Sequence, residues 1–145
     1  MTPEAHDKDI DQLNSLLRGE LSAVETYGQC IEKMEETSVK QSLSTLQSSH
    51  ATRATKLESR IRAMGGKPET DSGAWGTFAK LVEGGAKVFG KKAALAALEE
   101  GEDHGRKNYA DVDDMTAEVR HFVQMELQPE QQRTHNSLKA LKETF

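Results

Sequence analysis

A glutamate that follows a glycine and precedes a tyrosine by seven residues occurs twice in the chain. The first copy pairs Glu20 with Tyr27, and the second pairs Glu102 with Tyr109. Seven residues make about two turns of an α-helix, so each tyrosine lies on the same side of its helix as its glutamate. Such a carboxylate can bind a metal ion, with the tyrosine hydroxyl beside it as a hydrogen-bond partner.

A histidine on the apolar side of a helical stretch follows each copy, roughly thirty residues later. These histidines are His50 and His135. Two carboxylates and two imidazoles, one from each of four helices, can hold a metal ion in the core of a bundle. The predicted metal ligands are therefore Glu20, His50, Glu102 and His135.

Both glutamates occupy positions that a helical repeat assigns to the core. Glu20 continues an apolar series with steps of three and four residues, which contains Ile10, Leu13, Leu17, Val24, Tyr27, Ile31 and Met34. Glu102 lies in the same way between Leu98 and Tyr109. A buried carboxylate without a partner costs several kcal/mol or takes up a proton, so each needs a histidine, an arginine or a metal.

The same periodicity, with its breaks, predicts an all-α protein. Four long helices are expected at about 3–36, 38–64, 91–114 and 117–145. The connection at about 65–90 contains a short predicted helix over 74–87, and it is long enough to run back along a bundle. Pro129 should disturb the last helix. We therefore predict a four-helix bundle with a long crossover between helices 2 and 3, in a single domain over residues 1–145.

Composition limits the function further. The formal net charge of −5 argues against binding to the phosphates of nucleic acid. Residues 1–12 lack the apolar core of a signal peptide, and no run approaches membrane-spanning length, so we expect a cytoplasmic protein without a membrane partner. Cys30 is the only cysteine and is expected to be a small buried hydrophobe. The sequence contains no phosphate loop or nucleophile elbow, so we predict neither catalytic residues nor an organic cofactor.

The repeated glutamate–tyrosine pattern with its histidines resembles the ferritin-like superfamily, especially rubrerythrin and bacterioferritin. Segment 50–53 (His-Ala-Thr-Arg) is similar to a rubrerythrin helix. Segments 65–68 (Gly-Gly-Lys-Pro) and 131–135 (Gln-Gln-Arg-Thr-His) look more like small bacterial ferritin-like four-helix-bundle proteins of unknown function. The resemblance implies a ferritin-like bundle in which the glutamates are terminal ligands of a di-iron site, with a redox or stress-related role.

One departure from that pattern changes the expected site. Where the di-iron families have Glu-x-x-His, this chain has glutamine at Gln47 and Gln132, three residues before each histidine. A neutral amide bridges two metal ions poorly. The sequence therefore favours one divalent ion over an intact di-iron centre, with iron as the first choice and zinc or manganese as alternatives. Tyr27, Tyr109, Gln47 and Gln132 are expected to lie beside the ligands, and enzyme activity is left undecided.

A second hypothesis needs no metal. Measured from the helical hairpin turns, the point opposite Glu20 falls near Arg53 or Ala54, and His135 lies beyond the point opposite Glu102. Buried glutamate–histidine pairs, with Arg53 as a further cation, would then form a polar core without an ion. The protein would be a non-catalytic bundle that acts through surface contacts or self-association, a homodimer included, with a partner that the sequence leaves unnamed.

Overall fold

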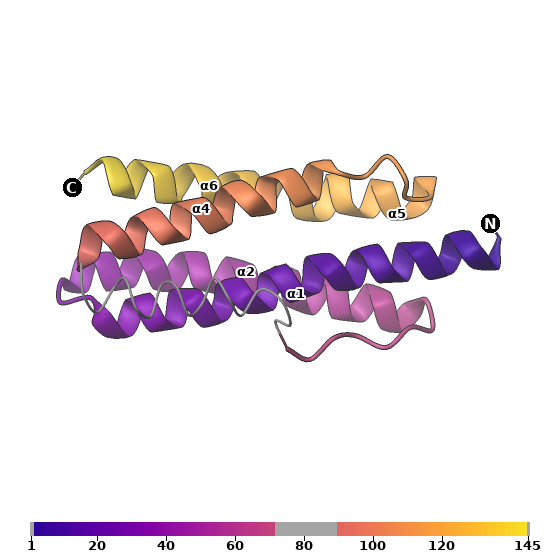
Figure 1. Ribbon diagram of the computed structural model, residues 1–145, viewed down its shortest axis with the longest axis horizontal. Coiled ribbons are helices and arrows are strands. Elements are labelled where there is room, and N and C mark those ends of the chain that lie inside the picture. The colour runs from indigo at the N-terminus through magenta and orange to yellow at the C-terminus, as the bar shows by residue number, and fades with distance from the viewer. Residues whose placement is uncertain (1, 72–89, 145) are drawn as a thin grey trace.

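The chain folds into a bundle of long helices without strands in the part that the computed structural model describes, residues 2–71 and 90–144. Figure 1 shows the helices lying side by side along one axis. In chain order they are α1 (Pro3–Lys33), α2 (Thr37–Ala63), α4 (Lys91–Ala110), α5 (Ala117–Phe122), the π-helical segment η2 (Val123–Leu127) and α6 (Gln128–Glu143). The last three form one continuous helical rod, so the predicted all-α bundle of four long helices is confirmed.

Local sequence sets the ends of the first hairpin. The Thr2 side chain accepts a hydrogen bond from the backbone N–H of Ala5, which caps α1 just before Pro3. Helix α2 ends at Ala63, and Gly65, two residues later, has a φ of 81°, a conformation that glycine adopts without strain. The N–H of Gly66 donates to the carbonyl of Ile61 at 2.9 Å and completes this C-terminal cap.

The connection between the two hairpins is a crossover. Helix α2 ends at one end of the bundle and α4 begins at the other, so both run in the same direction (Figure 1). The start of α4 lies next to the end of α1, where Lys91 forms an ion pair with Glu36. The short helix predicted over 74–87, with Trp75 and Phe78, lies outside the described residues. Helix α1 packs mainly along α2, and α4 packs mainly along α6.

Two buried polar side chains of α1 hold the neighbouring loops. Asp9 is fully buried and accepts hydrogen bonds from the backbone N–H and the hydroxyl of Thr116, at 3.1 and 2.5 Å. Because Thr116 is the N-terminal cap residue of α5, Asp9 caps that helix from another part of the chain. Asn14 binds the carbonyl of Lys67 and the N–H of Glu69, which fixes the chain as it leaves α2.

A π-turn interrupts the last rod just before Pro129. The N–H of Gln128 bonds to the carbonyl of Val123, five residues back, and Pro129 has no N–H to offer. This turn holds one residue more than an α-helical turn, so it rotates the following helix relative to an unbroken one. Met125 lies in this turn and is 63% exposed.

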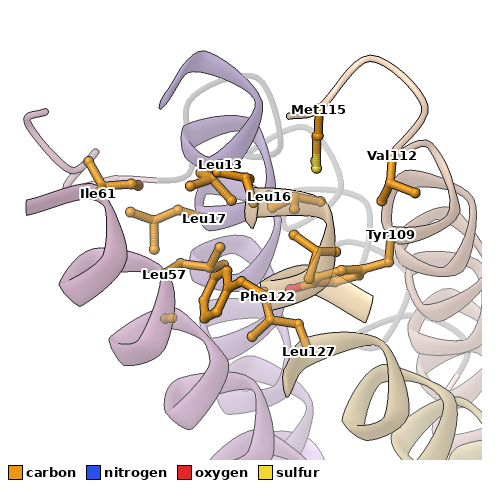
Figure 2. Packing of buried hydrophobic residues seen from close by; sticks show 13 residues of the cluster. Leu13, Leu16, Leu17, Leu57, Ile61, Tyr109, Val112, Met115, Phe122 and Leu127 are labelled. Atoms are coloured by element: carbon orange, nitrogen blue, oxygen red, sulfur yellow. The ribbon is translucent and has the colours of Figure 1, made fainter. Parts of the chain in front are cut away.

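The apolar core consists of two clusters. One contains Leu13, Leu17, Leu57, Phe122, Leu127 and their neighbours; Figure 2 shows its side chains meeting from several helices. The other contains Tyr27, Leu43, Leu95, Leu98, Leu138 and their neighbours. Along every long helix, buried polar residues separate the residues of the two clusters. The bundle therefore has a polar layer across its middle.

Candidate functional site in the middle of the bundle

The polar layer is organised around the imidazole of His50 on α2. Its Nδ1 lies 2.9 Å from Oε1 of Glu20 on α1, and its Nε2 lies 2.9 Å from Oε2 of Glu102 on α4. His50, Glu20 and Glu102 are only 3–4% exposed. The structure thus brings three of the four predicted ligands together, one from each of three helices.

Arg53, one turn after His50, is the cation of this layer. Its Nε donates to Oε2 of Glu20, and the residue is 1% exposed. The same guanidinium donates to the hydroxyls of Thr134 and Ser49, at 3.2 and 3.5 Å, on its α2–α6 side. Nε and Nη1 of the guanidinium therefore donate to protein oxygens, and a buried charge requires such partners.

Glu102 has two further donors. The hydroxyl of Tyr27 donates to its Oε2 at 2.8 Å, and the hydroxyl of Thr134 donates to its Oε1 at 2.9 Å. Gln131 donates to the backbone carbonyl of Glu102 and so fixes α6 against α4 at this level. With the bonds to Glu20 described above, all four carboxylate oxygens of the two buried glutamates accept hydrogen bonds from protein groups.

Tyr109 lies at the same level but has a different environment. The residue is 3% exposed, and its hydroxyl has no hydrogen-bond partner in the described part of the chain. Burial, and then the nearby charge of Glu20, raise the pKa of the phenol well above its ordinary value, so it stays protonated. Tyr27 is likewise kept protonated, because burial and Glu102 raise its pKa. Both tyrosines therefore lie beside the glutamates: Tyr27 is hydrogen-bonded to Glu102, whereas the Tyr109 hydroxyl lies near Glu20 without the geometry of a hydrogen bond.

The charges of this layer balance. Burial alone would raise the pKa of each glutamate, but His50 and Arg53 outweigh it and hold the pKa of Glu20 and of Glu102 below the usual value. Burial would lower the pKa of His50, but the two carboxylates outweigh burial and raise it. With both glutamates ionised and both bases protonated, two negative charges face two positive charges.

His50 also has partners when it is neutral. As an imidazolium it donates from both nitrogens to the two glutamates. As a neutral ring it can keep the proton on Nε2, for Glu102, while Nδ1 accepts from Nη2 of Arg53 at 2.5 Å. The ring of Tyr27 packs against it, with the ring centroids 5.1 Å apart. His50 can thus change protonation state without leaving its place.

His135, the fourth predicted ligand, faces another direction. It is buried, but its Nε2 lies 2.6 Å from Oδ1 of Asp103, at the edge between α6 and α4, and its Nδ1 has no partner in the described structure. The side chain of α6 that reaches Glu102 is Thr134 instead. The inward row of this helix is Leu127, Gln131, Thr134 and Leu138, so His135 lies one residue to the side of it.

The two glutamines also differ from the prediction. Gln47 is half-buried and donates to the backbone carbonyl of Val24, away from the carboxylates. Gln132 is exposed and bonds to Asn136. The prediction placed Gln132 by its spacing from His135, but the phase of the helix is set by its apolar neighbours, and these turn Gln131 inward instead.

This arrangement does not fit a dinuclear metal centre. Both predicted bridging positions hold amides that point elsewhere, His135 pairs with Asp103, and Arg53 binds Glu20 directly. Over residues 2–71 and 90–144, no group of three or more His, Cys, Asp or Glu side chains is arranged to hold a metal ion. The charged side chains here, Glu20, His50, Arg53 and Glu102, instead pair with one another in an ion-pair network.

Sequence reasoning missed Thr134, Ser49 and Asp103 as members or neighbours of the site. The signal for Thr134 was available, because it lies four residues before Leu138 and seven after Leu127, on the same helical row. Ser49 and Asp103 had no comparable signal, since a polar residue beside a buried one is ordinary on an amphipathic helix.

A cavity of about 40 Å³ adjoins the network between α1 and α4. Glu20, His50 and Glu102 line it together with both tyrosines. Glycines and other small residues of the two helices form part of the remaining wall.

No helix in the described residues is both long enough and apolar enough to cross a membrane.

Comparison with known proteins agrees with this architecture. A crystal structure described as ferritin like, diiron-carboxylate proteins from Bacillus anthracis str. Ames superimposes with a TM-score of 0.73 and 18% identity, over 98% of this chain and 99% of that chain. The chain therefore has the ferritin-like fold. Curated proteins give no match. A family model described as Domain of unknown function (DUF2383) matches residues 8–114. Since that is more than half of the chain, this protein belongs to the DUF2383 family.

Proposed function

We propose that this protein is a ferritin-like bundle that works without a bound metal ion. Arg53 supplies, inside the core, the positive charge that the buried carboxylates need. The observation that carries the proposal is the ion pair between Arg53 and Glu20, within a network where all four carboxylate oxygens already have protein donors. On this view the protein acts through its surface, by self-association or by contact with another protein, and does not catalyse metal oxidation.

The chemistry of arginine supports this reading. A guanidinium keeps its proton at any physiological pH, and its planar fork matches carboxylate geometry. Unlike a metal ion, it cannot leave the protein. The network therefore keeps its charge balance under conditions in which a metal would be removed, for example in the presence of a chelator.

A single divalent ion is the second candidate, and one observation favours it. Glu20, His50 and Glu102 all line the same small cavity, whose lining does not include Thr134 or Ser49. An iron or manganese ion placed there would support a redox or stress-related role, whereas a zinc ion, which has no redox chemistry, would only polarise bound groups. Our proposal for its ligands keeps Glu20, His50 and Glu102, and His135 would join them only if α6 rotated.

Metal content distinguishes the candidates. Protein prepared without a histidine tag should contain less than stoichiometric iron, zinc or manganese by elemental analysis. Its melting temperature at pH 8 should not change between chelator and added Zn²⁺, Mn²⁺ or anaerobic Fe²⁺. Stoichiometric metal, with a rise in melting temperature that His50→Ala abolishes, would refute the first proposal and support the second.

A variant without the internal cation gives the complementary test. Arg53→Met leaves the two carboxylates with less positive charge, so this variant should gain a metal-dependent rise in melting temperature that the wild type lacks. Arg62→Met is the matched control, because Arg62 is exposed and its ion pair is with Glu58 on the surface of α2. If Arg53→Met responds to metals no more than Arg62→Met does, Arg53 does not take the place of a metal ion.

A further inference from the structure

The cavity between α1 and α4 has features of a binding site that the ion-pair network does not use. Its volume is about 40 Å³. Helix α1 contributes Gly19 and Ala23 to its wall, and α4 contributes Gly101 and Gly105. These small residues leave space where larger side chains would fill the interface between two packed helices.

An unpaired polar group marks one side of this space. Tyr109 lines the cavity, is 97% buried and has no hydrogen-bond partner for its hydroxyl in the described residues. In Figure 2 its ring points from α4 toward the middle of the bundle. Buried polar groups almost always have a partner, either in the protein or in a bound molecule. The Tyr109 hydroxyl lies near Glu20 without the geometry of a hydrogen bond to it, so it has a hydrogen bond to donate to something held in the cavity.

Glu20 supplies the complementary group. Each of its carboxylate oxygens accepts one hydrogen bond in the network, and a carboxylate oxygen can accept two. Glu20 also lines the cavity. A bound molecule would thus find a donor in Tyr109 and an acceptor in Glu20.

Size and charge define the class of molecule. One water molecule needs roughly 10–15 Å³ of such space, so the cavity holds about three waters or one molecule of three or four heavy atoms. The surrounding network is already charge-balanced, and an additional buried charge would have no counter-ion. We propose that the cavity binds a short neutral molecule with both a hydrogen-bond acceptor and a donor, as in small primary amides and alcohols.

This inference rests on the proposed metal-free function, because a metal ion between the same glutamates would occupy the space. Formamide is the probe, and formate is the matched control, since it has the same number of heavy atoms but carries a negative charge. The measurement is a titration of the full-length protein followed by NMR, using backbone amide and tyrosine ring signals.

We expect formamide to give saturable shifts confined to residues around the cavity, and formate to give none. Tyr109→Phe should weaken formamide binding by about fivefold, the equivalent of one neutral hydrogen bond. Gly105→Ala should weaken it as well, because the added methyl narrows the cavity. That methyl would lie 3.9 Å from Nε2 of Gln131, an ordinary contact distance, so the fold should be kept.

Three outcomes would overturn the inference: shifts that stay linear with formamide concentration, equal affinity in wild type and Tyr109→Phe, or equal binding of formate. If the protein is free of metal but formamide does not saturate, only this inference fails. If the wild type binds a divalent ion with a rise in melting temperature, the proposed function fails first, and the cavity belongs to that ion.

Discussion

Replacing Arg53 with methionine tests the charge balance of the core most directly. Methionine keeps much of the length of the side chain but removes the cation. The two buried carboxylates, Glu20 and Glu102, are then left with only the charge of His50 to balance them. Removing one partner of a buried ion pair costs about 3–5 kcal/mol. For a chain of this length each kcal/mol corresponds to roughly 3 °C, so the melting temperature should fall by about 10–15 °C.

The double variant separates the ion pair from packing. Glu20→Gln combined with Arg53→Met removes both charges, so its cost should be smaller than the sum of the two single changes by about 2–3 kcal/mol. Equilibrium unfolding in urea, followed by circular dichroism at pH 7 with chelator present, measures all four proteins. The surface change Arg62→Met should cost less than about 0.5 kcal/mol.

Additive costs of the two single changes would refute this reasoning, because they would show that Glu20 and Arg53 do not interact. A loss below about 1 kcal/mol for Arg53→Met would refute it as well. That result would mean that the carboxylate is neutral or reaches solvent in the folded protein, and the network would then be an ordinary polar contact.

Three further predictions follow from the same structure. The raised pKa of His50 and the lowered pKa of the two buried glutamates place maximal stability between about pH 4.5 and 6.5. Stability falls at higher pH as His50 loses its proton, and at lower pH as the carboxylates gain protons. In urea titrations, His50→Gln should remove the decline at higher pH. Asp9→Ala should cost about 1–2 kcal/mol in urea unfolding, because Thr116 loses both of its bonds at the start of α5. Gly66→Ala should lower the melting temperature, because its methyl would lie 2.8 Å from the side chain of Ile10 and 3.1 Å from that of Ile61. Gly105→Ala should instead stabilise α4 by about 0.5–1 kcal/mol, and equal effects of the two changes would contradict this difference.

The fold could be predicted from the sequence because its signals are local and repeated. Apolar residues in steps of three and four define each helix, and Gly65 with Gly66 marks the end of α2. The burial of Glu20 and Glu102 followed from the same steps. These predictions needed only the phase of one helix at a time, which an uninterrupted α-helix keeps over many turns.

The last helix was predicted less well because its phase changes in the middle. The sequence does not reveal that Pro129 is accommodated by a π-turn, so the rotation of the last helix that leaves Gln132 outside could not be foreseen. Only the row from Leu127 to Leu138, read by itself, marks Thr134 as inward. The pairing of Arg53 with Glu20 was one of several partners that the spacing allowed. Choosing among them depends on how α2 sits against α1, which is a property of the whole bundle.

The π-turn also bears on how the sequences of such bundles should be aligned. Because residues 123–127 hold one residue more than an α-helical path needs, and Met125 projects into solvent there, loss of a single residue would convert this turn to α-helix. The residues after the turn would still point to the same sides of the bundle, because the wider turn contains the one extra residue. A homologue that lacks one residue at this place can therefore share every core position of α5 and α6, and the alignment gap belongs inside the helix, where gaps are usually avoided.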